Sequence, residues 1–380
     1  MNPETSAAPS EGLRAPFRAD IVGSFLRPAA VAQARRRRSS NDLSQAELTA
    51  VEDAAITELV AQQSRAGLGM ATDGEFRRAW WHLDFWGGLE GFDVVDLDEG
   101  VQFQGVQTKP RGMHVSGKVA FGDSHPFLDS FRYLKNAADE HGVIPKLTIP
   151  SPTVLDFRLD AGHIDTAAYS DREAVMEDVV TAYRDALAAF YDAGARYIQL
   201  DDTAWGYLCS EAEIAKAQAR GISTDGIAER YAALINRVLD SRPSDLVVTT
   251  HVCRGNFRST WISAGGYEPV AEQLLGETDY DGYFLEYDTD RAGGFEPLRF
   301  LPPGDKRVVL GLITTKSGSV EEPSEIRRRI DEAARFAPLD QLALSPQCGF
   351  ASTEEGNLLT EAEQWAKVGR VVEIAAQVWP

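Results

Sequence analysis

Short apolar runs rich in β-branched residues alternate along the chain with longer stretches in which apolar positions recur every three or four residues. The first pattern is typical of strands buried on both faces of a parallel sheet, and the second of helices that cover such a sheet. The predicted strands are Asp20–Phe25, Leu68–Asp73, Val143–Ile149, Arg196–Asp202, Leu246–His251, Gly282–Tyr287, Arg307–Ile313 and Gln341–Ser345. Helical patterns lie between them, for example over Gln45–Ala66, Arg172–Ala193, Ile214–Asp240 and Pro323–Phe336.

The repeated pattern gives about eight strand–helix units in one α/β chain, which favours a single (β/α)8 TIM barrel over an open, doubly wound sheet. Residues Val101–Phe121 alternate like a hairpin and are expected to form an insertion in the barrel. Residues 1–17 are rich in Ser, Pro and Ala and are expected to form a flexible leader. Residues 18–380 then form one domain.

Composition and charge narrow the class of protein. With 43% hydrophobic and 25% charged residues, the chain of 380 residues has the composition of a folded enzyme. Its net charge of −20 argues against binding to nucleic acid, which requires a basic surface, and the run Arg35–Arg38 is interpreted as a solvated helix face. No apolar run reaches the roughly 18 residues of a membrane helix. The polar start predicts no secretory signal, and the three cysteines are expected to be reduced thiols in a cytoplasmic protein.

Polar residues gather at the ends of the predicted strands and just beyond them. They are Ser24, Asp73 with Glu75, Asp201 with Asp202, His251, Glu286 and Cys348. In a barrel all of these ends open onto one face, where active sites are built. Tolerance of polar residues at strand ends explains two or three such positions better than it explains the whole series. We therefore expect a functional site at this face.

Four of the residues at this face have the side chains of a metal site. Side chains two positions apart on a strand point to the same side, so His251 and Cys253 can bind one ion together. With Glu286 and Cys348 they form a mixed thiolate, imidazole and carboxylate set that suits tetrahedral Zn²⁺. The pattern alone leaves open a buried pair of cysteines beside a core histidine, because 95 residues separate Cys253 from Cys348.

Longer motifs surround these residues. They are DIVGSFLRP (20–28), TDGEFRR (72–78), QLDDTAW (199–205), HVCRGNF (251–257), FLEYD (284–288) and SPQCGFAS (345–352). Through these motifs the chain resembles the catalytic C-terminal barrel of the cobalamin-independent methionine synthase family, over nearly its whole length after the leader. The segments TDGEFRRAWWHLDFW and LSPQCGFASTEEGN are similar to those of the short, single-barrel bacterial proteins of this family. The resemblance implies zinc bound by His251, Cys253, Glu286 and Cys348.

The resemblance also implies a substrate. Val22 and Ser24 would hold an amino-acid thiol through backbone and hydroxyl groups, and Glu75 and Asp201 would pair with its ammonium group. The implied reaction methylates homocysteine to methionine, with zinc keeping the sulfur as a reactive thiolate. The expected partners are this thiol and a methyl or alkyl donor such as 5-methyltetrahydrofolate, without nucleic acid or membrane. A homo-oligomer is left open.

The chain departs from the family pattern in ways that leave the donor and the proton donor open. The protein is expected to lack the duplicated N-terminal barrel of full-length synthases, and Thr314-Thr315-Lys316 stands where the family has Asp-Ile-His. Asp201-Asp202-Thr203 replaces the Asp-Glu-Pro of the family. Without the histidine of the family, Asp202 and Lys316 are the candidate proton donors.

Two alternatives keep the same barrel. One is the opening of an epoxide by a zinc-bound thiol, as in the related epoxyalkane:coenzyme M transferases, where cations such as Arg77, Arg78 or Lys316 would meet a sulfonate. The other is a non-catalytic barrel that binds a thiol or a metal.

The remaining aromatic, histidine and cysteine residues have weaker signals. The run Trp80, Trp81, Phe85 and Trp86 predicts either core packing or a wall over a flat donor. Cys209 and the histidines outside the metal motif are expected to be ordinary structural residues; these histidines are His82, His114, His125, His141 and His163.

Overall fold

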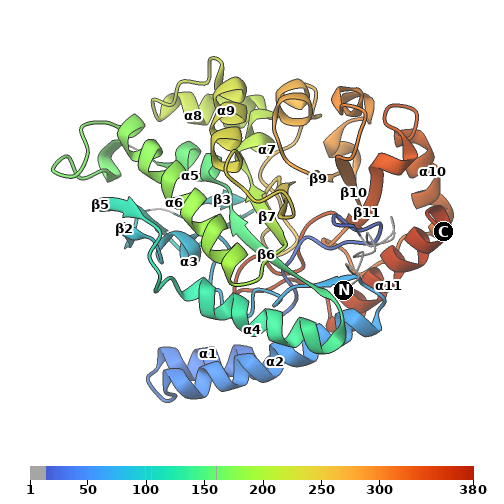
Figure 1. The fold of residues 1–380 in the computed structure, drawn as a ribbon, viewed down its shortest axis with the longest axis horizontal. Coiled ribbons are helices and arrows are strands. Elements are labelled where there is room, and N and C mark those ends of the chain that lie inside the picture. Colours follow the sequence, from blue (N-terminus) through green and yellow to red (C-terminus); the bar gives the residue numbers. More distant parts are fainter. Residues whose placement is uncertain (1–13, 99, 104, 160) are drawn as a thin grey trace, which may run out of the picture.

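Seven parallel strands form the wall of a barrel in the computed structural model, which describes residues 14–380 except residues 99, 104 and 160 (Figure 1). The strands stand in the order in which they occur along the chain. They are β1 (Met70–Ala71), β6 (Ile144–Pro150), β7 (Tyr197–Asp202), β8 (Val247–Val252), β9 (Gly282–Glu286), β10 (Arg307–Ile313) and β11 (Leu342–Pro346). Each corresponds to a predicted strand, and the expected TIM-barrel architecture is confirmed.

The eighth position of the barrel is taken by an extended segment rather than a regular strand. The predicted strand Asp20–Phe25 makes only an isolated bridge through Ala19 to Leu344 of β11. On its other side, the backbone N–H of Phe25 donates to the carbonyl of Gly74, just after β1 (3.1 Å). This segment therefore bonds to both edges of the seven-stranded sheet and closes it.

Helices surround the sheet in Figure 1, with α2 lying against α4 and α11 against β11. They are α1 (Ala29–Ser39), α2 (Gln45–Arg65), α3 (Leu83–Trp86), α4 (Pro126–His141), α5 (Pro152–Arg158), α6 (Arg172–Asp192), α7 (Ala204–Leu208), α8 (Glu211–Ala219), α9 (Ile227–Leu239), α10 (Pro323–Ala333) and α11 (Glu361–Val378). Short 3-10 turns and one π-helical turn, η3 (Glu272–Glu277), take the place of longer helices on either side of β9. Capping boxes fix the starts of α2, at Ser44 and Glu47, and of α11, at Thr360 and Glu363.

The single helix predicted over Ile214–Asp240 is wrong. The structure divides it into α8 and α9, with a turn between them. Gly221 and Gly226 in this turn have φ angles of 82° and 60°, a conformation that glycine adopts readily and that ends a helix. The apolar period continued across the break and concealed it.

The predicted hairpin over Val101–Phe121 is confirmed in part. Its long strand, β5 (Arg111–Ala120), pairs antiparallel with β2 (Glu90–Asp96), which lies before the predicted segment. Between them β3 (Gln102–Phe103) and β4 (Val106–Gln107) make a second, smaller hairpin. The insertion is therefore larger than the sequence predicted.

The end of the expected leader lies on the barrel. The side chain of Phe17 is buried, and Arg307 of β10 donates hydrogen bonds to the carbonyls of Arg14 and Pro16. Residues 1–13 of the expected leader lie outside the described residues.

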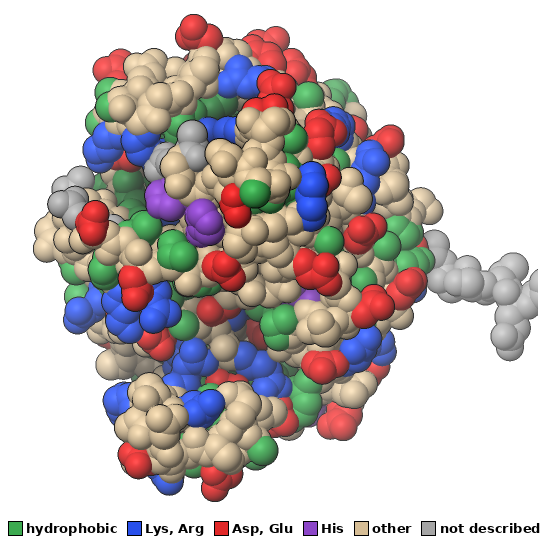
Figure 2. Space-filling model, turned by 90° about the vertical axis from the view of Figure 1, so that its left-hand side faces the viewer, with side chains coloured by type: hydrophobic (Ala, Val, Ile, Leu, Met, Phe, Trp, Pro, Cys, Tyr) green, Lys and Arg blue, Asp and Glu red, His purple; other side chains and the backbone are tan. Residues whose placement is uncertain are grey.

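The distribution of charged side chains and the character of the helices can be compared with the expectations from composition. On the face shown in Figure 2, acidic and basic side chains are interspersed among the described residues. Arg35 of the arginine run pairs with Glu52, at 3.1 Å. Among the described residues no helix is long and apolar enough to cross a membrane.

The interior of the barrel explains where the polar residues point. Val22, Phe284, Val309 and Ala343 come from four different segments and form one buried apolar cluster. Side chains alternate along a strand, so the residue two positions after Val22 points to the same side as Val22, and the residue two positions after Phe284 points to the same side as Phe284. Both of these residues lie nearer the end of the barrel. This places Ser24 and Glu286 at that end.

Candidate metal and thiol site

The four predicted metal ligands lie together where strands of the barrel end. Their ligand atoms are all within 4.8 Å of one another. The Sγ atoms of Cys253 and Cys348 are 3.8 Å apart, and His251 Nε2 is 3.9 Å from Glu286 Oε1. Ligand atoms around a tetrahedral zinc ion lie roughly 3.3 to 3.8 Å apart, given bonds of about 2.0 to 2.3 Å. The spacing of the side chains suits such an ion.

The hydrogen bonding of His251 also fits a metal. Its ring is buried, and neither ring nitrogen has a hydrogen-bond partner among the described residues. Leaving a buried polar atom unsatisfied is costly, and coordination would satisfy one nitrogen. The nitrogen, sulfur and carboxylate donors are those that zinc prefers. The residues present therefore fit the predicted zinc ion.

Contacts to Arg254 and Arg291 orient the Glu286 carboxylate. The backbone N–H of Arg254 donates to its Oε1 (3.2 Å), and Arg291 Nη2 pairs with its Oε2 (3.2 Å). Arg291 also pairs with Asp288 at 3.2 Å, so two carboxylates share its charge. Burial raises the pKa of Glu286, against the opposing charges of Lys316 and Arg291. Contacts of this kind hold a ligating carboxylate in place.

Glu75 lies in the turn after β1 with an unusual backbone. Its φ of 61° is in the left-handed region, which few residues other than glycine adopt. The turn is fixed by bonds from its N–H to Asp73 Oδ1 (2.9 Å) and from Arg27 Nη2 to its carbonyl (2.9 Å). Its buried Oε1 accepts a bond from Thr148 Oγ1 (3.0 Å), whereas Oε2 has no partner among the described residues. An unpartnered carboxylate oxygen in a cavity wall suits a cationic ligand.

Asp201, Val22 and Ser24 complete this part of the wall. Gln199 Nε2 donates both to Asp201 Oδ1 (2.7 Å) and to the carbonyl of Val22 (2.8 Å), which ties β7 to the closing segment. Burial raises the pKa of Asp201 to about 7, opposed by His251 and assisted by Glu75. A cation that entered the cavity would favour the ionised form of this carboxylate.

The two candidate proton donors lie outside this cavity. Asp202 directly follows Asp201, so on a strand its side chain points to the opposite face. There it accepts a bond from the Thr153 hydroxyl and caps the start of α7. Lys316 Nζ lies 3.7 Å from Asp288 Oδ2 and is not among the residues that line the cavity. Neither residue lines the cavity, so the roles of Asp202 and Lys316 as proton donors stay predictions.

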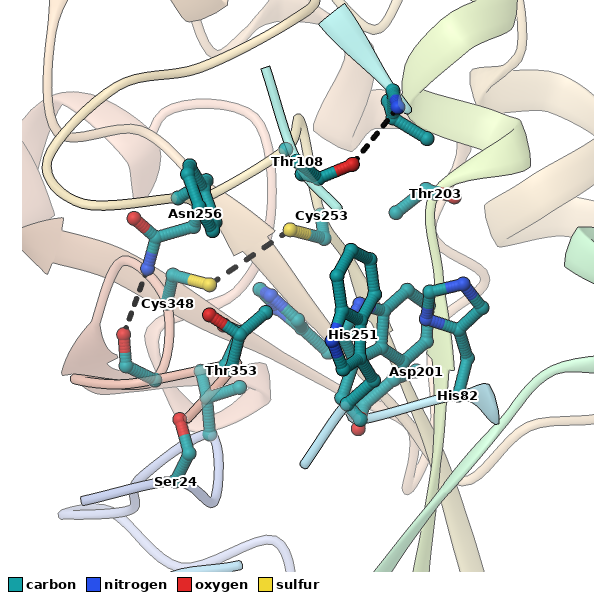
Figure 3. Close-up of a pocket in the computed structure, with 18 of the residues that line it drawn as sticks. Ser24, His82, Thr108, Asp201, Thr203, His251, Cys253, Asn256, Cys348 and Thr353 are labelled. Carbon is teal, nitrogen blue, oxygen red and sulfur yellow. Dashed lines mark hydrogen bonds between the residues drawn. The ribbon is translucent and has the colours of Figure 1, made fainter. Parts of the chain in front are cut away.

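One cavity joins these groups (Figure 3). Its lining includes all the predicted thiol-binding residues and the metal ligands His251, Cys253 and Cys348. Sequence reasoning missed other residues of the wall, namely His82, Val101, Phe103, Thr108, Arg158, Thr203, Tyr207, Asn256 and Phe257. Of the aromatic run, Trp80 and Trp81 line the cavity, while Phe85 and Trp86 pack in the core. Core packing is confirmed for Phe85 and Trp86, and a wall of Trp80 and Trp81 over a flat donor stays a prediction.

A parallel α/β barrel that places a possible metal site of sulfur, nitrogen and oxygen donors beside buried carboxylates is the scaffold of an enzyme for a small ligand. The chain belongs to the cobalamin-independent methionine synthase family: residues 17–377 match the family model described as "Cobalamin-independent synthase, Catalytic domain". This match confirms the resemblance, and the family is that of methionine synthase, a methyltransferase.

Individual relatives support the assignment of the chain to this family. The uncharacterized protein YxjH of Bacillus subtilis is 49% identical over 96% of both chains. A protein of Listeria monocytogenes, assigned as a vitamin-B12-independent methionine synthase, is 38% identical, with a TM-score of 0.76 over 96% of this chain and 98% of its own. The B12-independent methionine synthase of Shewanella sp. W3-18-1 shares the fold, with a TM-score of 0.70 at 19% identity over 94% of this chain and 96% of its own.

Proposed function

We propose that the protein methylates homocysteine to methionine, using zinc held by His251, Cys253, Glu286 and Cys348. One observation carries this proposal: the predicted metal ligands His251, Cys253 and Cys348 line the same cavity as Glu75, whose Oε2 has no hydrogen-bond partner among the described residues. The first group selects a thiol and the second selects an ammonium group. A small amino-acid thiol is the ligand that has both.

Zinc, when bound, would lower the pKa of the thiol and keep its sulfur nucleophilic at neutral pH. The residues of the chain supply position. Glu75 and Asp201 pair with the ammonium group, and Ser24 and the Val22 carbonyl border the rest of the amino acid. The sulfur then faces the end of the cavity that holds the cysteines, where a methyl group can be placed in line with it.

Aromatic residues exclude water from the reacting atoms. Trp80, Trp81 and Phe257 line the cavity, and the ring of Phe103 lies 5.3 Å from the ring of Phe257, between centroids. The inserted hairpin therefore covers the site. A dry cavity protects a nucleophilic sulfur and strengthens the charge contacts that hold the substrate.

The alternative, opening of an epoxide by a thiol with a sulfonate, has less support. That thiol needs a cation for its sulfonate, but Arg77 is paired with acidic residues of α2 and Arg78 lies 3.6 Å from Glu75. Arg158 does line the cavity, where it bonds to His82 Nε2 and the Tyr207 hydroxyl. Lys316 faces Asp288. Two carboxylates, Glu75 and Asp201, line the part of the cavity that would hold the amino acid, and Glu75 Oε2 has no hydrogen-bond partner among the described residues, which favours the amino-acid thiol.

A screen of thiol and donor pairs tests the function. Homocysteine or mercaptoethanesulfonate is combined with 5-methyltetrahydrofolate, methylcobalamin, an S-methyl compound or an epoxide, and new thioethers are detected by mass spectrometry. We expect methionine from homocysteine with one of the methyl donors, and none from the Cys348→Ser variant. A thioether from mercaptoethanesulfonate and an epoxide alone would establish the alternative enzyme. Binding of zinc and thiol without any product would indicate a non-catalytic barrel.

A further inference from the structure

His82 lies in the cavity wall, in the loop between β1 and α3. Its side chain is buried, and the rings of Trp80, Trp81 and Trp86 lie 6.0, 4.6 and 5.2 Å from it, between centroids. In Figure 3 it stands on the opposite side of the view from Cys348. The aromatic packing leaves the ring little freedom to turn, so its nitrogens have fixed directions.

The partner of His82 determines where its proton is. Arg158 Nη1 lies 3.1 Å from His82 Nε2. A guanidinium group has only N–H donors, so Nε2 must accept and the proton of the neutral ring must be on Nδ1. Burial, and then the charge of Arg158, lower the pKa of His82 well below its usual range. The ring is therefore a neutral donor, and its buried Nδ1 has no partner among the described residues.

A second, larger cavity meets the thiol site at this residue. Its volume is about 580 Å³, against about 50 Å³ for the thiol cavity. His82, Val101, Arg158 and Tyr207 line both cavities. Apolar side chains of α5 and of the β2–β5 hairpin form much of the rest of the lining. A second substrate, larger than the thiol, fits this space and would reach the thiol past His82.

We propose that His82 donates a hydrogen bond from Nδ1–H to the leaving heteroatom of a methyl donor bound in the larger cavity, and that this heteroatom is a tertiary amine nitrogen, as in 5-methyltetrahydrofolate. This inference rests on the proposed function and adds to it a catalytic residue and the site of the donor. In the transfer the bond from the methyl carbon to the heteroatom breaks, its electron pair stays on the heteroatom, and the thiolate sulfur forms the new C–S bond. The heteroatom then carries an extra electron pair, which accepts the bond from His82.

The protons balance through the solvent. The thiol loses its proton to water when it binds as a thiolate, and the heteroatom takes one up from water as the demethylated donor leaves. His82 stays neutral throughout and stabilises the developing charge. Asp202 and Lys316 do not line the cavity, whereas His82 does.

Two variants of one position test the role. His82→Leu removes the donor, and His82→Asn keeps an N–H near the place of Nδ1. We expect His82→Leu to keep zinc and homocysteine affinity but to lower kcat by about 100-fold, the loss typical for one donor to a developing charge. His82→Asn should recover at least about tenfold of this loss. The donor in these assays is 5-methyltetrahydrofolate, whose leaving atom is an amine nitrogen. Turnover by the wild type only with methylcobalamin or S-methylmethionine, which have no such nitrogen, would overturn this inference and leave the proposed function standing.

A spectroscopic measurement gives a readout independent of activity. ¹⁵N NMR of the zinc-loaded protein with labelled histidine should show His82 as the Nδ1–H tautomer, and the Nδ1 resonance should shift when the donor is added. Equal kcat in His82→Leu and wild type, loss of homocysteine binding in His82→Leu, or an Nε2–H tautomer would each overturn the role of His82 and leave the proposed function standing. Failure of the wild type with every donor would instead overturn the proposed function, and with it this inference.

Discussion

At the scale of single residues, Glu75 Oε2 and the ring nitrogens of His251 share one property. They are buried polar atoms without partners among the described residues. Buried polar groups in folded proteins are nearly always satisfied, so such atoms in a cavity wall indicate contacts to a ligand. The charge of Glu75 and the lone pairs of His251 make these contacts different, one to a cation and one to a metal.

The Glu75→Gln variant separates these two contacts. Loss of one partner from a desolvated charge pair costs about 2–5 kcal/mol, so we expect homocysteine affinity to fall roughly 30-fold or more. Zinc content should not change, since Glu75 is not among the grouped ligands. Mercaptoethanesulfonate, which has no ammonium group, is the matched control ligand and should bind as before. Calorimetry measures the affinities of the two thiols, and metal analysis measures the zinc content. An equal loss of affinity for both thiols would show that Glu75 has a structural role.

Two cysteine variants, Cys348→Ser and its control Cys209→Ser, test the metal site. Cys348→Ser should lose most of the zinc, about one ion per chain in the wild type, because a tetrahedral site needs each ligand. Cys209 is buried elsewhere, with its Sγ 3.3 Å from the Trp205 carbonyl, so Cys209→Ser should keep the zinc. Metal analysis after gel filtration measures both variants. A wild type that is active without metal would contradict the site.

The sequence predicted the residues of the site better than their roles. The two-residue period of a strand predicted that His251 and Cys253 share one face, and Glu286 and Cys348 were predicted from their places at or just beyond the ends of other strands and from the family motifs. The same period shows that Asp201 and Asp202 cannot both face the cavity, a conclusion that the sequence analysis did not draw. His82 carried no signal in the sequence, since its proposed role depends on a contact to Arg158 of α5, 76 residues away in the chain.

At the scale of elements, α7 packs directly against the metal motif. A Cβ atom added at Gly206 of α7 would lie 2.4 Å from the carbonyl oxygen of Cys253. Such a contact forces the backbone of the His-x-Cys motif to move. The glycine is therefore needed for the position of a ligand that lies 47 residues away in the chain.

Gly206→Ala should weaken zinc binding without abolishing folding. We expect a loss of about 10- to 100-fold, the range found when residues that support a ligand are changed. Gly369, in α11, has no atom within 4 Å of an added Cβ, so Gly369→Ala is the control for added helix propensity. Competition with a chromogenic chelator measures both affinities. Unchanged zinc affinity in Gly206→Ala would show that the motif tolerates the shift.

The strands were predictable because burial on both faces gives each of them a short apolar run. The connections were predicted less well, because their structure depends on contacts between residues that are distant in sequence. The segment Asp20–Phe25 has the composition of a strand, but its two neighbours bond to different parts of it and no regular ladder forms. The strand β2 was missed because Glu90–Asp96 is mostly exposed, with Phe92 as its one buried residue, and carries three acidic side chains, so it has no clear apolar alternation. Only its pairing with β5 identifies it as a strand.

At the scale of the whole molecule, a buried ion pair joins the closing segment to the barrel. Lys146 Nζ lies 3.0 Å from Asp20 Oδ1, and both side chains are fully buried. The Tyr197 hydroxyl and the backbone N–H of Phe17 donate to the other oxygen of Asp20. The first segment of the barrel, which holds Ser24, is thereby fixed to β6 and β7.

Asp20→Asn should destabilise the whole protein by about 3–5 kcal/mol, because it leaves the Lys146 charge buried without its counter-ion. The double variant Asp20→Asn, Lys146→Met removes both charges and should recover much of the loss. Urea denaturation followed by circular dichroism measures the difference. If the single variant unfolds at the same urea concentration as the wild type, the pair does not stabilise closure of the barrel.

The central claim is that the thiol of homocysteine binds directly to the metal held by His251, Cys253, Glu286 and Cys348. X-ray absorption at the zinc edge tests it, with the protein measured alone and then with saturating homocysteine. The account predicts that one oxygen or nitrogen neighbour of zinc is replaced by sulfur, so that the number of sulfur neighbours rises from two to three. An unchanged set of neighbours at saturating homocysteine would contradict it.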